Sequence, residues 1–164
     1  MKNDIKTVQM ANAVLLPEIV RLLEEGHTVT LPLRGYSMRP FLEDGRDKAL
    51  LRKPDSISVG DAVLAEVAPK HYVLHRIVSI KGDHVTLRGD GNINVERCRL
   101  SNIKATAVGF YRKGREQLDS TDGRKWRIYS WVWTRLLPIR PYLLFAMHPH
   151  VPNRFKKKQI QRKE

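Results

Sequence analysis

The 164-residue chain lacks the residues that define several classes of protein. Its one cysteine, Cys98, cannot form an internal disulfide, and a lone cysteine fits a reducing compartment. Five histidines besides His75 show no spacing, with each other or with Cys98, that suits zinc: His27, His71, His84, His148 and His150. We therefore predict neither a metal site nor a cofactor.

Long apolar runs are also missing. Residues 11–20 are too few and too interrupted for a membrane anchor or a signal sequence. Residues 126–147 contain three arginines and two prolines, which break any run near the twenty apolar residues that a bilayer requires. We therefore expect a cytoplasmic protein, at most peripheral at the inner membrane surface.

Acidic residues become scarce toward the end of the chain. Residues 1–110 hold 16 Lys/Arg against 13 Asp/Glu, whereas residues 111–164 hold 14 against 4. Within the basic part, residues 126–145 interleave aromatic residues and leucines with arginines. The positive charge of the protein therefore belongs mainly to its C-terminal third.

Three interpretations of this C-terminal segment stay open. It can form a helix that packs Trp131, Leu136 and Leu137 on the preceding domain. It can lie in a membrane interface through residues 126–147 and the basic tail, because Trp and Tyr suit headgroup depth and Lys/Arg attract anionic lipid. Nucleic-acid binding is the least favoured, because the basic cluster comes with no reading helix or RNA-binding motif.

The hydrophobic pattern before this segment predicts a strand-rich domain. Residues 17–25 have the apolar stripe of a helix, with Pro17 in its first turn and Gly26 as its end. The period then changes to two, and we predict strands near 29–33, 47–52, 61–67, 71–80, 84–88 and 104–112, with residues 81–83 as a hairpin turn. We expect a mainly β domain over residues 1–115, with an antiparallel sheet coiled on itself or a small sandwich, and a basic, aromatic-rich tail over 116–164.

Three polar residues in this domain are the groups that a hydrolytic triad requires. Ser37 precedes a bend limited by Pro40, His75 lies in a predicted strand, and Asp90 lies between two glycines. Serine needs a base within hydrogen-bond reach, histidine can accept and return that proton, and a carboxylate can fix the histidine tautomer. Each residue also has a structural interpretation: Ser37 as a turn cap, His75 as a half-buried strand residue, and Asp90 as a turn residue.

The segments around these residues resemble one enzyme superfamily. Residues 35–40 read Gly-Tyr-Ser-Met-Arg-Pro, residues 59–63 Val-Gly-Asp-Ala-Val, residues 74–77 Leu-His-Arg-Ile and residues 89–92 Gly-Asp-Gly-Asn. In this order they resemble the serine peptidases that include type I signal peptidases and the self-cleaving LexA-like repressors. Bacterial members use a lysine base where this chain has His75, so the chain is in this respect similar to the endoplasmic-reticulum and archaeal signal peptidases, which pair serine with histidine.

The resemblance implies a coiled, barrel-like all-β fold and a set of roles. Ser37 would be the nucleophile, His75 the base and Asp90 the group that orients His75, while the backbone N–H groups of Tyr36 and Ser37 would bind the oxyanion. We predict a serine endopeptidase that cleaves a precursor or leader peptide. The alternatives are a non-catalytic module of the same fold that binds peptides or membrane surfaces, and a LexA-like self-processing peptidase.

Overall fold

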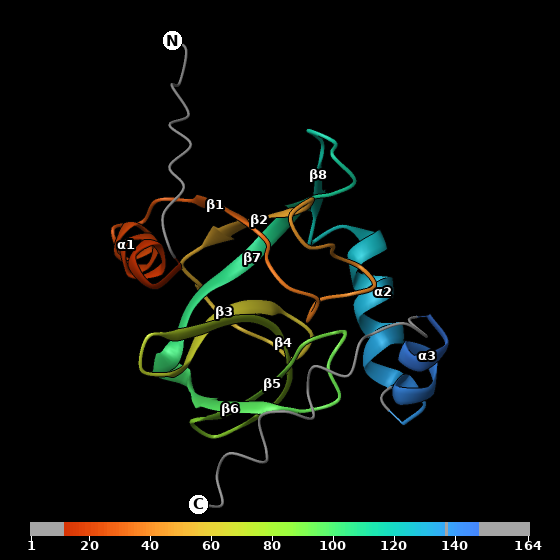
Figure 1. The fold of residues 1–164 in the computed structure, drawn as a ribbon. Coiled ribbons are helices and arrows are strands. Elements are labelled where there is room, and N and C mark those ends of the chain that lie inside the picture. The colour runs from red at the N-terminus through yellow and green to blue at the C-terminus, as the bar shows by residue number, and fades with distance from the viewer. Residues whose placement is uncertain (1–11, 137, 148–164) are drawn as a thin grey trace, which may run out of the picture.

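The computed structural model describes residues 12–136 and 138–147, and these residues form a mainly β protein. Eight strands and three α-helices are present in the described chain (Figure 1). In chain order they are α1 (Asn12–Glu24), β1 (Val29–Pro32), β2 (Lys48–Arg52), β3 (Ala62–Ala68), β4 (His71–Lys81), β5 (His84–Arg88), β6 (Glu96–Arg99), the short 3₁₀ helix η1 (Leu100–Asn102), β7 (Ile103–Tyr111), β8 (Leu118–Ser120), α2 (Arg124–Arg135) and α3 (Arg140–Met147).

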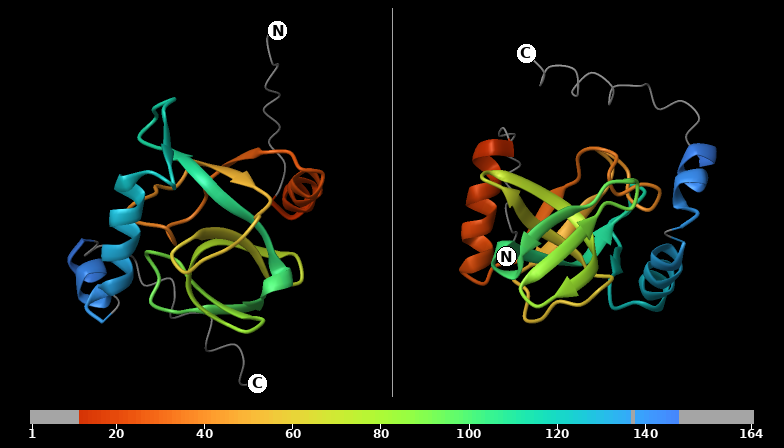
Figure 2. Two further views of the ribbon diagram at one scale, coloured as in Figure 1. Left: turned by 180° about the vertical axis from the view of Figure 1, so that it is seen from behind. Right: turned by 90° about the horizontal axis from the view of Figure 1, so that it is seen from below.

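The strands form one antiparallel sheet in the order β1-β2-β7-β3-β4-β5-β6, and β8 pairs with β7 outside this path. The strands curve strongly (Figure 1), but the edge strands β1 and β6 do not pair with each other. The described strands therefore form the mainly β, antiparallel sheet that we predicted, and this sheet is not closed into a barrel. The helix α1 lies at one side of the molecule, and α2 and α3 lie at the opposite side (Figure 2).

Two hydrophobic clusters cover the two faces of the central strands. On β3, Ala62 and Leu64 belong to the larger cluster, which also takes Leu23 of α1 and Trp126 of α2. The alternating residues Val63 and Ala65 belong to a second cluster, which is built mainly from β3, β4 and β5. Alternate residues of a strand point to opposite faces, and both faces are apolar here because each is covered.

The alternation predicted for the strand 71–80 holds as far as Ile77. Val73 and Ile77 pack in the second cluster, whereas Leu74 packs against the larger one. Strict alternation would place Ile80 on the face of Leu74, but it packs in the second cluster. The reason is a bulge between Ile77 and Ser79 in the pairing with β5, because one extra residue reverses the faces that follow.

The first helix differs from its prediction at the N-terminal end. Because α1 begins at Asn12, Pro17 lies inside the helix and not in its first turn. The apolar stripe is as predicted, since Ile19 and Leu23 are buried against the sheet and Gly26 follows the last turn with a positive φ of 90°. In the described chain no helix is both long and apolar enough to cross a bilayer.

The helix α2 packs on the sheet through residues other than those named in the first of the three interpretations. Trp126, Ser130 and Trp133 are buried, whereas Trp131 is 59% exposed. Leu136 is half-buried, and Leu137 lies outside the described residues. The inward positions follow the helical spacing i, i+4 and i+7, and a polar member, Ser130, lies within that row.

Candidate active site

The loop that carries Ser37 is held by the residues that follow it. Met38, Phe41 and Leu42 are buried in the larger hydrophobic cluster. Gly35 has a positive φ of 86°, a region that glycine enters without strain, and its N–H donates to the Asp44 carboxylate at 2.8 Å. The side chains that follow Ser37 point into the core, whereas Ser37 itself is half-buried.

Asp47 fixes the far end of the same loop. Its buried carboxylate accepts hydrogen bonds from the backbone N–H groups of Glu43 and Lys113 and forms an ion pair with Arg46. Burial alone would raise the pKa of Asp47, but these donors hold the pKa below its usual value. The loop is therefore attached to both β2 and the segment after β7.

Two glycines after β5 allow the segment that follows this strand to touch the Ser37 loop. The Gly91 N–H donates to the Ser37 carbonyl oxygen at 2.8 Å. A Cβ at residue 89 would lie 2.4 Å from that same oxygen, and a Cβ at residue 91 would lie 2.6 Å from the Tyr36 carbonyl oxygen. Neither position has room for a side chain, so the Gly-Asp-Gly sequence here permits close approach of two backbones.

His75 borders the same space. A Cβ at residue 89 would lie 3.0 Å from His75 Nε2 as well as against the Ser37 carbonyl oxygen. The imidazole Nε2 and the Ser37 carbonyl oxygen therefore both border the space beside Gly89, although 38 positions separate the two residues in the sequence. In the described chain no hydrogen bond joins the Ser37 hydroxyl to His75; catalytic hydrogen bonds in ligand-free enzymes are often long and tighten when substrate binds.

The other ring nitrogen of His75 is held by Glu96, the first residue of β6. His75 Nδ1 lies 2.8 Å from Glu96 Oε2. A carboxylate can only accept, so this contact makes Nδ1 the protonated nitrogen and leaves the lone pair on Nε2, facing the Ser37 loop. The His75 side chain is 4% exposed and that of Glu96 is 31% exposed.

Burial lowers the pKa of His75 below its ordinary value of 6.5, and the neighbouring carboxylates of Glu96 and Asp90 oppose that shift only partly. His75 is therefore neutral at pH 7. A neutral imidazole with a free Nε2 lone pair can accept a proton.

Asp90 does not occupy the position that the triad prediction gave it. Its carboxylate makes two hydrogen bonds with Arg76, Nε to Oδ1 at 2.8 Å and Nη2 to Oδ2 at 2.7 Å, and it accepts a third from the Tyr129 hydroxyl at 3.0 Å. Asp90 and Arg76 are both fully buried. The prediction that Asp90 orients His75 is corrected: His75 Nδ1 donates to Glu96, because Arg76 and Tyr129 occupy the Asp90 oxygens.

Arg76 joins the sheet to the C-terminal helix. Its Nη1 donates to the Gly60 carbonyl oxygen at 2.7 Å and to the Ser130 hydroxyl, and its guanidinium lies over the Trp126 ring at 4.6 Å. Trp133 Nε1 adds a hydrogen bond to the Asp90 carbonyl oxygen at 3.1 Å. The helix α2 is therefore part of the structure that holds the Asp90 loop, not an independent appendage.

The proposed oxyanion donors remain available. The N–H groups of Tyr36 and Ser37 donate to no backbone or side-chain acceptor in the described residues. Donors without an internal acceptor are one requirement of an oxyanion hole.

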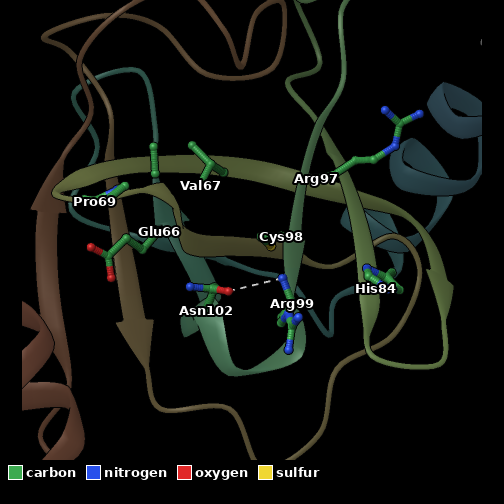
Figure 3. A pocket seen from close by; sticks show the side chains of 9 residues that line it. Glu66, Val67, Pro69, His84, Arg97, Cys98, Arg99 and Asn102 are labelled. Carbon is green, nitrogen blue, oxygen red and sulfur yellow. Dashed lines mark hydrogen bonds between the residues drawn. The ribbon is translucent and has the colours of Figure 1, made fainter.

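A separate cavity of about 560 Å³ lies elsewhere on the molecule (Figure 3). It is formed by the end of β3, the first residue of β5, β6 and η1, and its lining includes Glu66, Arg97, Cys98 and Asn102. Burial raises the pKa of the Cys98 thiol, so the sulfur is protonated at neutral pH and a poor nucleophile. This cavity contains none of the residues of the predicted triad.

No protein-family model matches the chain, and no curated protein matches it at a significant level. The assignment of a function therefore depends on the arrangement of Ser37, His75 and Glu96 and on the motifs that carry these residues.

Proposed function

We propose that the protein is a serine endopeptidase, with Ser37 as the nucleophile, His75 as the general base and Glu96 as the carboxylate that orients the base. The observation that carries this proposal is the two-sided position of His75, with Nδ1 on Glu96 at 2.8 Å and Nε2 directed to the space beside Gly89 that the Ser37 loop also borders. A purely structural histidine would not need one nitrogen free and facing a half-buried serine loop.

In the proposed reaction, Ser37 Oγ attacks the carbonyl carbon of a peptide bond and its proton passes to His75 Nε2. The imidazolium that forms is stabilised by the Glu96 carboxylate. The oxyanion is bound by the Tyr36 and Ser37 N–H groups. His75 then gives the proton to the leaving amine as the C–N bond breaks, and water hydrolyses the acyl-enzyme by the same steps.

The substrate in this proposal is a precursor or leader peptide. The exposed fraction of Tyr36, 59%, and that of Ile93, 63%, leave two apolar side chains on the loops that flank the serine. A peptide chain can contact such side chains on either side of the scissile bond. The resemblance to signal peptidases, and no feature of the site, implies a preference for small residues at the cleavage site.

A second candidate is a non-catalytic module of the same fold that binds a peptide. The observation in its favour is that the Ser37 hydroxyl makes no hydrogen bond with His75 among the described residues. The self-processing reaction of LexA-like proteins is a variant of the first candidate, in which the substrate is the chain itself.

A fluorophosphonate probe distinguishes these candidates. We expect the full chain to be labelled at Ser37, and we expect Ser37→Ala and His75→Ala to abolish the label. Ser101→Ala and His71→Ala are matched controls, because both residues are exposed and His71 lies on the same strand as His75. Labelling that survives Ser37→Ala, or an unlabelled parent that still binds peptides, contradicts the peptidase proposal.

Incubation of the parent protein without an added substrate tests self-processing. Mass spectrometry should detect a single new internal cleavage, absent in Ser37→Ala, if the chain is its own substrate. Cleavage of added peptides with the chain left intact assigns the activity to separate substrates.

A further inference from the structure

Exposed hydrophobic side chains are concentrated in the two C-terminal helices. Ten large hydrophobic residues are exposed in the described chain, and six of them lie between residues 128 and 145: Ile128, Trp131, Val132, Ile139, Tyr142 and Phe145. Tyr142 and Phe145 are each 77% exposed, more than any other large hydrophobic residue in the described chain. Single exposed apolar residues are ordinary, but a concentration of this kind marks an interaction surface.

The inward face of α2 is already occupied. Trp126, Ser130 and Trp133 contact the sheet and the Asp90 loop. Arg140, at the start of α3, is buried and its Nη2 donates to the Trp133 carbonyl oxygen at 2.8 Å. Because these contacts fix which sides of the helices face the protein, the exposed aromatic residues lie on the sides that face solvent.

The outward face of α2 combines apolar and cationic residues. Arg124, Ile128, Trp131 and Arg135 follow one another at three- and four-residue spacing and are all exposed. The Arg135 guanidinium lies over the Trp131 ring, 4.4 Å from its centroid. Trp at the level of lipid headgroups, with arginines beside it, is the composition of helices that lie in a membrane interface.

We propose that α2 and α3 form a docking surface for an anionic lipid bilayer, into whose headgroup region Trp131, Tyr142 and Phe145 insert. The charge of the two helices favours this occupant, since residues 124–147 hold five Lys/Arg and no Asp/Glu. Lys and Arg near an anionic surface add to the attraction that the aromatic side chains provide. This inference does not require the peptidase activity, because it depends on residues outside the Ser37–His75–Glu96 arrangement.

Two other occupants are less well matched to this surface. A second copy of the chain would bring two positively charged faces together, which is unfavourable. Nucleic acid would attract the arginines but would not require the exposed aliphatic residues Ile128, Val132 and Ile139 beside them. Both alternatives are outcomes of the experiments that follow.

Tryptophan fluorescence of the full chain reports the contact directly. Trp126 and Trp133 are buried in the protein, 5% and 7% exposed, so they already have apolar surroundings, whereas Trp131 is 59% exposed. Vesicles of phosphatidylcholine with about a third phosphatidylglycerol should shift the emission to shorter wavelength, and vesicles of phosphatidylcholine alone should shift it less. Trp131→Phe should remove the shift while vesicle binding persists.

Co-sedimentation with the same vesicles measures the contribution of each side-chain type. Tyr142→Ser with Phe145→Ser should weaken binding at least about tenfold, whereas the matched control Val59→Ser with Leu100→Ser should leave it unchanged. Arg127→Gln with Arg135→Gln should weaken binding about tenfold, and Lys53→Gln with Lys81→Gln, which removes the same charge from exposed positions elsewhere, should have a smaller effect.

Three results would overturn the proposal. The first is equal, weak sedimentation of the parent with neutral and anionic vesicles. The second is tight binding of a DNA duplex that Tyr142→Ser with Phe145→Ser does not change, together with no vesicle binding. The third is self-association in sedimentation equilibrium that the same double substitution abolishes. Because all substituted residues are exposed, circular dichroism should show that each variant keeps its fold.

Discussion

His75 and Arg76 are neighbours on β4, and each pairs with a carboxylate from the chain after β5, but the two pairs differ in their surroundings. Arg76 and Asp90 are both fully buried, and their polar atoms are bonded to Gly60, Tyr129 and Ser130 as well as to each other. His75 is buried, but its partner Glu96 is 31% exposed, and Nε2 faces the Ser37 loop.

The difference separates a structural pair from a chemical one. A buried ion pair whose oxygens are all occupied holds elements together, and it has no lone pair or proton to offer a substrate. A histidine with one nitrogen bonded to a carboxylate and the other free is arranged to move a proton. Adjacent residues of one strand serve these two purposes because their side chains point to opposite faces of the sheet.

The largest effect is expected when the structural pair is broken. Asp90→Asn keeps the shape of the side chain but leaves the buried Arg76 charge unpaired, which should lower the free energy of unfolding by about 3–5 kcal/mol. Urea denaturation measures the change. Asp55→Asn is the control, because Asp55 is 84% exposed and its ion pair with Arg52 should contribute less than about 1 kcal/mol. Equal, small effects of the two substitutions would remove the structural assignment of Asp90.

Breaking the other pair should affect reactivity more than stability. Glu96→Gln should slow the labelling of Ser37 by about 100-fold, since the amide supports the wrong His75 tautomer and cannot stabilise the imidazolium. The free energy of unfolding should change by less than about 1–2 kcal/mol, because Glu96 is partly exposed. Unfolding of the Glu96→Gln protein, or labelling of Ser37 in this variant at the parental rate, would contradict this assignment of Glu96.

The pH dependence of labelling is a second test of the pairing between His75 and Glu96. Because burial lowers the pKa of His75, reactivity should persist below pH 6.5 and be lost only as the pH falls through the lowered value. Glu96 raises the pKa of His75, so Glu96→Gln should move this acid limb to still lower pH. A pH profile of the labelling rate for parent and variant tests the sign, and a shift to higher pH would exclude Glu96 as the partner of His75.

The smallest effect is expected at a third buried cation. Arg140 is 2% exposed, yet its Nε and Nη1 have no hydrogen-bond partner in the described residues. Burial lowers its pKa, which reflects the unfavourable transfer of the charge from water. Arg140→Met should therefore leave the melting temperature unchanged or slightly raised, in contrast to Asp90→Asn. Calorimetry showing a loss above about 2 kcal/mol would show that the hydrogen bond from Arg140 to the Trp133 carbonyl oxygen outweighs the cost of burying the charge.

The main strands could be predicted from the sequence because their apolar residues alternate. All six predicted strands are present with ends within one residue of those expected, and the hairpin turn at residues 81–83 is confirmed by the pairing of Lys81 with His84. The strand β6 was missed, since its sequence Glu-Arg-Cys-Arg shows no alternation of apolar residues. It is an edge strand, and its pairing with β5 supplies the order that its composition does not predict.

The candidate site could be predicted only in part for the same reason. The motifs correctly brought the Ser37 loop, His75 and the Gly89–Gly91 segment to one place. The choice between Asp90 and Glu96 depended on the register of β5 with β6, in which Leu87 pairs with Glu96, and on the arginine next to His75. Neither the register of a missed strand nor the competition of Arg76 for a carboxylate can be derived from the spacing of motifs.

Gly89 has a consequence for how this arrangement can change. The distance between the Ser37 loop and His75 depends on a residue with no side chain, so even one methyl group at that position would force them apart. Gly89→Ala would therefore separate Ser37 from His75 without altering any group that takes part in the chemistry. The approach of Ser37 to His75 therefore depends as much on the missing side chain of Gly89 as on the residues around it.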